Sequence, residues 1–410
     1  MTLLSIPSLF LSATLICAFY TTPAFSSKFD NKTFDEVQTV ANQNNPEAQY
    51  SLGYMLANGE GVQQDYSQAV VWYTKAAEQG YTWAQTSLGY LYDSGKGVQQ
   101  DHAQAAVWYT KAAEQGDAAA QHNLGYLYEI GKGVQQDYAQ AANWYTKAAE
   151  QGDAWAQSSL GLLYKKGKGV QQDYSRAVVW HTKAAEQGNA GAQYSLGIAY
   201  DNGEGVKKDP VQAVIWYTKA AEQGHARAQY NLGIAHDNGE GVKKDPVQAV
   251  IWYTKAAEQG HAWAQYNLGV AYDNGEGVKK DPVQAVMWYT KAAEQGHAWA
   301  QYNLGVAYDN GEGVKKDPVQ AVMWYTKAAE QNIPDAQYNL GLMYYSGKGI
   351  PQDSMLAHTW LSIALANGES EAYQLVMNLI LKMKPEELLK SHNKLTEFRE
   401  KFSIPDPVIS

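Results

Sequence analysis

The dipeptide Leu-Gly recurs every 36 residues along this chain. It occurs nine times at this spacing, from Leu52-Gly53 to Leu340-Gly341, with no insertion or deletion between copies. A fixed period of this length is typical of solenoids, in which each repeat packs only against its neighbours. A chain of 410 residues would otherwise suggest about two or three domains. The repeat predicts one continuous stack instead.

The second half of each repeat has the pattern of an amphipathic helix. In residues 45–80, Ala69, Trp72, Tyr73 and Ala76 fall at positions i, i+3, i+4 and i+7 of one helical face. An aspartate precedes this face in every repeat, and in four later repeats it is followed directly by proline. Aspartate suits a helix N-cap, and proline suits the first helical residue. A glycine closes most repeats, as expected just beyond a helix C-terminus.

The first half of each repeat predicts a shorter helix, which carries Ala48 and Leu52 on one face. Gly53 lies inside this helix, where glycine costs about 0.5–1 kcal/mol relative to alanine. Its recurrence predicts a close approach of the second helix, and we expect Ala76 and Ala77 to face it. Two glycines then mark a tight link between the helices, where positive φ angles are required.

The first 26 residues differ from the repeats. Residues 3–20 are mostly apolar and carry no charge, and Ala24-Phe25-Ser26 places small residues at positions −3 and −1 of a cleavage site. This pattern predicts a secretory signal peptide, residues 1–26, although it lacks Lys or Arg at its start. An uncleaved membrane anchor is the alternative. The single cysteine, Cys17, lies in this segment, so we expect an exported mature chain without a thiol, either periplasmic or secreted.

Charge and motifs argue against several functional classes. The formal net charge is −10, whereas nucleic-acid binding needs a basic face. Gly95-Lys96 lacks the Ser or Thr that follows the lysine of a phosphate-binding loop. Ser391 and Lys394 match the spacing of a serine-enzyme motif, but its companion motifs are absent from the sequence. We therefore expect no enzymatic activity, no cofactor and no nucleic-acid partner.

Three histidines, His225, His261 and His297, recur one repeat apart. That separation is too large for a shared metal ion, and no cysteine or carboxylate set accompanies them. We interpret them as capping or surface residues and expect no metal site. Lysine pairs such as Lys207-Lys208 lie in the links between helices and are expected to be solvated.

The repeat resembles the Sel1-like repeats, relatives of the tetratricopeptide repeats. The resemblance rests on Leu268-Gly269, Tyr272, Gly275, Trp288-Tyr289 and the run KAAEQG at 291–296, which recur in the other units. It covers nine units: 45–80, 81–116, 117–152, 153–188, 189–224, 225–260, 261–296, 297–332 and 333–368. It implies an all-α fold, an α/α right-handed superhelical solenoid that scaffolds protein–protein contacts. It also implies an absence of catalytic residues and, in bacteria, frequent export and roles in the envelope or in host contact.

The flanking segments extend the pattern. Residues 27–44 predict an N-terminal capping helix that starts with a capping box at Thr33 and Glu36. Residues 369–402 predict two C-terminal capping helices, and 403–410 a flexible tail. Polar terminal helices would shield the ends of the core.

Tryptophan occupies two positions of the repeat. Nine tryptophans, from Trp72 to Trp360, recur in the second helix and are predicted to lie in the core. The other four share one slot in the first turn of the first helix, which varies more than any other position. This variable slot points about 160° away from the leucine face, so deep burial is not expected.

The variable slot and the residue four positions later form one stripe in each repeat, and this later residue is asparagine in several repeats, such as Asn231, Asn267 and Asn303. Tryptophan often anchors protein interfaces, and asparagine can bond to a peptide backbone or a glycan. We predict that this stripe binds a partner; its residues are Trp83, Asn123, Trp155, Arg227, Asn231, Trp263, Asn267, Trp299 and Asn303. Packing between neighbouring helix pairs is the alternative explanation.

The sequence thus predicts an exported, monomeric scaffold that binds one or more proteins or peptides through the concave face of its first helices. We expect no membrane span in the mature chain. A glycan- or cell-wall-binding protein that uses the same stripe is the alternative.

Overall fold

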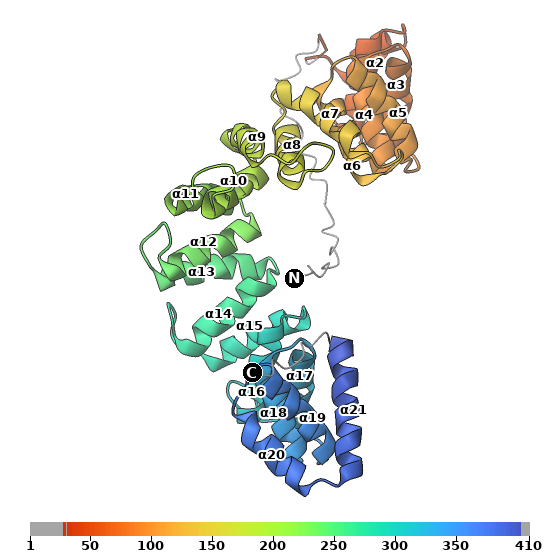
Figure 1. The fold of residues 1–410 in the computed structure, drawn as a ribbon. Helices are drawn as coiled ribbons and strands as arrows, with labels where there is room; N and C mark the ends of the chain where they lie inside the picture. Colours follow the sequence, from red (N-terminus) through yellow and green to blue (C-terminus); the bar gives the residue numbers. More distant parts are fainter. Residues whose placement is uncertain (1–27, 30, 403–410) are drawn as a thin grey trace. The chain divides into compact units, whose positions relative to one another are not determined.

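The computed structural model describes residues 28–29 and 31–402. Within these residues the secondary structure comprises 21 α-helices and no strand. The described residues divide into two compact units, with the boundary between residues 172 and 173, and each unit is an α/α solenoid (Figure 1). The fold class predicted from the repeat is confirmed. The predicted signal peptide and the tail at 403–410 lie outside the described residues.

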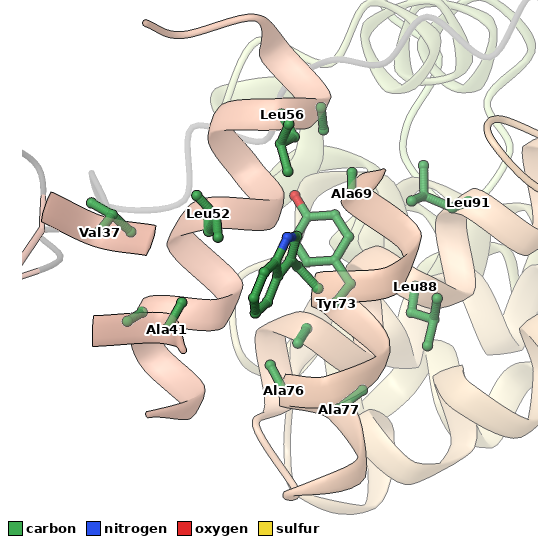
Figure 2. Packing of buried hydrophobic residues seen from close by; sticks show 14 residues of the cluster. Val37, Ala41, Leu52, Leu56, Ala69, Tyr73, Ala76, Ala77, Leu88 and Leu91 are labelled. Atoms are coloured by element: carbon green, nitrogen blue, oxygen red, sulfur yellow. The ribbon is translucent and has the colours of Figure 1, made fainter. Parts of the chain in front are cut away.

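The first unit contains eight helices, and each packs against the next. They are α1 (Phe34–Ala41), α2 (Pro46–Asn58), α3 (Tyr66–Glu78), α4 (Thr82–Ser94), α5 (His102–Glu114), α6 (Ala118–Ile130), α7 (Tyr138–Glu150) and α8 (Ala154–Lys166). Figure 2 shows the apolar side chains that join α1, α2, α3 and α4 into one core.

The second unit contains α9 to α21, and α9 to α19 continue the same succession. Its helices are α9 (Tyr174–Glu186), α10 (Ala190–Asn202), α11 (Pro210–Glu222), α12 (Ala226–Asn238), α13 (Pro246–Glu258), α14 (Ala262–Asn274), α15 (Pro282–Glu294), α16 (Ala298–Asn310), α17 (Pro318–Glu330), α18 (Pro334–Ser346), α19 (Ser354–Ala366), α20 (Ala372–Lys382) and α21 (Pro385–Phe402). Across the chain, the even-numbered helices α2 to α18 are the first helices of repeats, and the odd-numbered α3 to α19 are the second helices.

Local sequence signals set the helix ends as predicted. The Asp65 carboxylate accepts a hydrogen bond of 3.0 Å from the Gln68 N–H, and an aspartate caps every other second helix in the same way. Thr33 and Glu36 form the expected capping box at α1. The link glycines, such as Gly59, have positive φ angles. No helix in the described part of the chain is both long enough and apolar enough to cross a bilayer.

In the eight repeats whose two helices lie in one unit, the glycine inside the first helix faces a large side chain of the second helix. A Cβ on Gly53 would lie 2.7 Å from Cδ1 of Tyr73, and no other side chain is as close. Figure 2 shows the Tyr73 ring directed toward the helix of Leu52. The prediction that Ala76 and Ala77 face this glycine is therefore wrong.

The second-helix tryptophans are less buried than predicted. Trp72, Trp288, Trp324 and Trp360 are buried, whereas the other five are half-buried. In eight repeats the lysine three residues later lies over the indole, with Nζ 3.9–4.2 Å from the ring centroid. These tryptophans form the edge of the core and carry a cation on their outer face.

The last helix folds back over the last repeat. Both α20 and α21 pack on α19, and Figure 1 shows α21 alongside α19. Trp360 of α19 contacts Phe398 and Phe402 of α21, with ring centroids 4.9 and 6.3 Å away. Ser391 is fully buried, and its Oγ lies 2.8 Å from both His358 Nδ1 and Thr359 Oγ1. Ser391 therefore holds α21 in place.

Candidate functional site

The variable-slot tryptophans lie at the second residue of their helices. Trp83, Trp155, Trp263 and Trp299 belong to α4, α8, α14 and α16, and they are 42, 52, 53 and 39% exposed. These values exclude deep burial, in agreement with the variability of the slot. They also leave each indole with enough free surface to contact a partner.

Neighbouring rings hold three of these indoles. Trp263 packs edge-on against His297 of the next repeat, with ring centroids 4.3 Å apart. Trp83 lies 6.1 Å from Tyr50 of the preceding repeat, and Trp299 lies 6.1 Å from Tyr302 of its own helix. A side chain already held in this way loses little conformational entropy when it binds.

Arg227 occupies the variable slot of α12 and is exposed. Burial lowers the pKa values of His225 and His261, and the positive charge of Arg227 lowers them further. The slot thus places a cation in one repeat and an indole in each of the next two repeats.

The stripe asparagines Asn123, Asn231, Asn267 and Asn303 are half-buried. In the second unit these asparagines lie beside tyrosines of the preceding repeat: Asn231 beside Tyr217, Asn267 beside Tyr230 and Tyr253, and Asn303 beside Tyr289. Burial raises the pKa of these phenols, and the neighbouring asparagine amide opposes that rise. These asparagines therefore lie where two repeats meet, and each amide has donor and acceptor capacity for a partner.

The three periodic histidines are helix N-caps. Nδ1 of each ring accepts the backbone N–H three residues later at 3.2–3.3 Å, in His225, His261 and His297. An accepting Nδ1 requires a neutral imidazole. Burial favours that form, since it lowers the pKa of all three and takes that of His297 to about 4. The interpretation as capping residues is confirmed.

Small acidic clefts open where repeats of the second unit meet. One has a volume of about 100 Å³ and lies between α10, α11 and α12; its polar lining is Asp201, Tyr217, Asn231 and Glu240. A second, of about 50 Å³, is built from the equivalent residues Asp273, Tyr289, Asn303 and Glu312. Small-molecule sites usually have about 300–1,000 Å³. These clefts are large enough only for water or for the end of one side chain.

Each cleft contains two carboxylates and one phenol. The Tyr217 hydroxyl donates to Asp201 Oδ2 at 3.3 Å, and the Tyr289 hydroxyl donates to Asp273 Oδ2 at 3.4 Å. The glutamate of the next link, such as Glu240, supplies the second carboxylate. The junction between the sixth and seventh repeats, which lies between these two clefts in the sequence, has the same four residue types: Asp237, Tyr253, Asn267 and Glu276.

The junction between the eighth and ninth repeats shows that the link position beside the aspartate accepts a positive charge. Lys348 holds the link position that Glu240 and Glu312 hold in earlier repeats, and its Nζ forms an ion pair with Asp309. Asp309 is the counterpart of Asp201. A cationic side chain therefore fits beside this aspartate.

Sequence reasoning missed the acidic clefts. The two carboxylates of one cleft are 39 residues apart, and they belong to different repeats. The available signal was the residue type at one link position, which is lysine in Lys96, Lys132, Lys168 and Lys348 but glutamate in Glu60, Glu204, Glu240, Glu276 and Glu312.

Comparison with known families decides the identity of the repeat. The Sel1 repeat profile matches residues 46–81, 84–117, 118–153, 156–189, 190–225, 226–261, 264–297, 300–333 and 334–369. The chain belongs to the Sel1 repeat family. Sel1 repeats form a non-catalytic fold that serves protein interaction, and Sel1 repeat proteins typically bind other proteins.

Two solved Sel1 repeat structures are similar to this chain. One is the crystal structure of a protective antigen of uropathogenic Escherichia coli strains that displays an SLR fold; it has 38% identity, a TM-score of 0.61, and coverage of 90% of this chain and 87% of that one. The other is a Sel1 repeat protein from Oxalobacter formigenes, with 38% identity, a TM-score of 0.54, and coverage of 60% and 96%. No curated protein matches the sequence.

Proposed function

We propose that this protein is a non-enzymatic scaffold that binds partner proteins through the stripe on its first helices. The observation that carries the proposal is the set of half-exposed tryptophans, three of which are held by neighbouring rings. Aromatic anchors of this kind supply most of the binding energy of many interfaces. The negative net charge supports a protein partner rather than a nucleic acid.

We further propose that the protein is exported and acts in the periplasm or outside the cell. The apolar, uncharged stretch at residues 3–20 supports a signal peptide. The Escherichia coli relative is a protective antigen, which supports a role in the envelope or in host contact.

The acidic clefts add a preference for a partner with basic side chains. A lysine or arginine that reached Asp201 and Glu240 would lie between two carboxylates and could form an ion pair there, as Lys348 does with Asp309. A partner segment would place apolar groups on the tryptophans and cationic groups in the neighbouring clefts. Such an arrangement would give specificity through charge as well as affinity through aromatic contact.

Removing two stripe tryptophans is expected to weaken partner binding without unfolding the chain. Residues 27–410 would capture partners from envelope extract and from host-cell lysate, and a purified partner would then be titrated by calorimetry. The pair Trp263→Ala and Trp299→Ala should weaken binding by at least about 2 kcal/mol, which is about 30-fold. Helical circular dichroism should not change, because both side chains lie on the surface.

The matched control is the pair Val283→Ala and Val319→Ala. These valines lie in the second helices of the same two repeats and are each 62% exposed. Loss of binding in the double valine variant but not in the double tryptophan variant would contradict the proposed binding face. Retention on purified peptidoglycan, with no protein captured, would favour the glycan-binding alternative.

Replacing the cleft glutamates by lysine is expected to weaken binding of a basic partner and to reduce its salt dependence. The triple change Glu240→Lys, Glu276→Lys and Glu312→Lys introduces the residue type that Lys348 already provides at this position. We expect at least about a tenfold loss of affinity, since like charges then face each other. The control is Glu222→Lys, Glu258→Lys and Glu294→Lys, exposed positions in the last turns of α11, α13 and α15. Equal losses in both triples would exclude a specific role of the clefts.

A further inference from the structure

Helix α20 corresponds to the first helix of a repeat, but no second helix packs on it among the described residues in the way seen in the nine repeats. Ala372 of α20 lies 36 residues after Ala336 of α18, so α20 stands where a tenth repeat would begin. In the ninth repeat, α18 packs against both α17 and α19. After α20, however, α21 packs along α19 instead of following the usual course (Figure 1). Among the residues that the structure describes, none covers one side of α20, which is therefore exposed.

The open face of α20 is apolar. It consists of Tyr373, Met377, Ile380 and Leu381, which are 50, 39, 37 and 81% exposed. Their spacing of i, i+4, i+7 and i+8 places them on one side of the helix. The expectation that the terminal helices are polar is wrong for α20.

The equivalent surface of α18 is covered. Tyr373 and Met377 correspond to Gln337 and Gly341, both of which are buried. A Cβ on Gly341 would lie 2.7 Å from Cγ of Leu361, so a second helix of the same chain needs glycine at this point. Met377 is incompatible with that close approach. A partner that covers this face of α20 therefore packs in a different way from the second helix of a further repeat.

The charges at the two ends of α20 have opposite sign. Glu369 and Glu371 precede the helix, whereas Lys382 and Lys384 lie at its end. Glu369 and Lys384 lie equally far from the midpoint between residues 376 and 377, and so do Glu371 and Lys382. An antiparallel pair of such helices brings the acidic end of each level with the basic end of the other, and it also opposes their dipoles.

We propose that the open face of α20 is a homodimer interface, in which two copies of the chain pack α20 against α20 in antiparallel orientation about a two-fold axis near Met377. A two-fold axis makes one apolar patch complementary to itself. This inference replaces the monomer expected from the sequence, and it does not depend on the proposed function. A patch on one short helix is smaller than the interface of a stable complex, so we expect a dissociation constant on the order of 10–100 µM.

Sedimentation velocity of residues 27–410 tests the dimer between about 1 and about 300 µM protein, a range that spans the expected dissociation constant. The sedimentation coefficient should rise toward that of a dimer as the concentration increases. Met377→Glu with Leu381→Glu should abolish the rise while helical circular dichroism is kept. Val283→Glu with Val319→Glu, which also charges two exposed apolar positions, should dimerise like the native chain.

Charge reversal tests the orientation. Glu369→Lys with Glu371→Lys should weaken dimerisation several-fold, and so should Lys382→Glu with Lys384→Glu. All four changes together should restore it. A chain that stays monomeric at every concentration would overturn the proposal and indicate a different occupant. So would a dimer that survives the Met377 and Leu381 changes, or one that the fourfold reversal does not restore.

Discussion

Gly197→Ala is expected to destabilise the second unit by about 2 kcal/mol, although alanine is the better helix former. A Cβ at this position would lie 2.5 Å from both Cδ1 and Cε1 of Tyr217. Tyr217 is only 2% exposed, and its hydroxyl donates to Asp201, so the ring is held in place against Gly197. Alanine gains up to about 1 kcal/mol of helix propensity, but overpacking at this distance reaches the upper end of about 1–3 kcal/mol or exceeds it.

A second glycine of α10 provides the control. A Cβ on Gly191 meets only Asn189 Oδ1, at 3.4 Å, and the backbone there has an ordinary helical φ. Gly191→Ala should therefore raise stability by a few tenths to about 1 kcal/mol. Urea denaturation followed by circular dichroism measures both variants. Effects of the same sign would contradict the explanation.

A double-mutant cycle identifies the ring as the cause. Tyr217→Ala removes the atoms that would meet a Cβ on Gly197. In that background Gly197→Ala should be neutral or stabilising, so the two changes should be strongly non-additive. Additive effects would place the conflict elsewhere.

The sequence predicted the helices well because the signals at their ends are local. Asp209 caps α11 and Pro210 begins it, and the same chemistry recurs in each later repeat up to α17. The pattern of apolar residues also placed Ala48 and Leu52 in the core. The same pattern did not show which part of the second helix contacts Gly53. The spacing of apolar residues defines the buried face of a helix, but it does not define how one helix is rotated relative to its neighbour. Tyr73 takes that place instead of Ala76 and Ala77.

The candidate site was only partly predictable for a related reason. The exposure of Trp263 followed from one property of the sequence, the variability of its slot. The proximity of Asn231 to Tyr217 and the cleft between Asp201 and Glu240 both involve residues of different repeats. Such contacts depend on how one repeat stacks on the next, which a pattern within one repeat does not contain.

The largest loss of stability is expected where that stacking is tightest, at the second glycine of the links. Gly277 has a φ of +72°, and a Cβ there would lie 2.2 Å from the carbonyl oxygen and 2.5 Å from the carbonyl carbon of Pro246, the first residue of α13 in the preceding repeat. The obstacle is backbone at the start of a capped helix, so it cannot rotate away as a side chain can. Gly277→Ala should cost at least about 3 kcal/mol: about 1 kcal/mol from the positive φ and the remainder from separating two repeats.

The change Gly61→Ala separates the cost of the positive φ from the cost of the steric conflict with the preceding repeat. Gly61 occupies the same position of the first link and has a φ of +70°, but a Cβ there would meet only Met55 Cε, at 3.7 Å. No second helix of a preceding repeat lies beneath this link, since α1 is the only described helix before α2. Gly61→Ala should therefore cost only the roughly 1 kcal/mol of the positive φ. Urea denaturation of both variants measures the difference, which is the steric part of the contact between repeats. Equal losses would mean that backbone conformation alone retains glycine in the links.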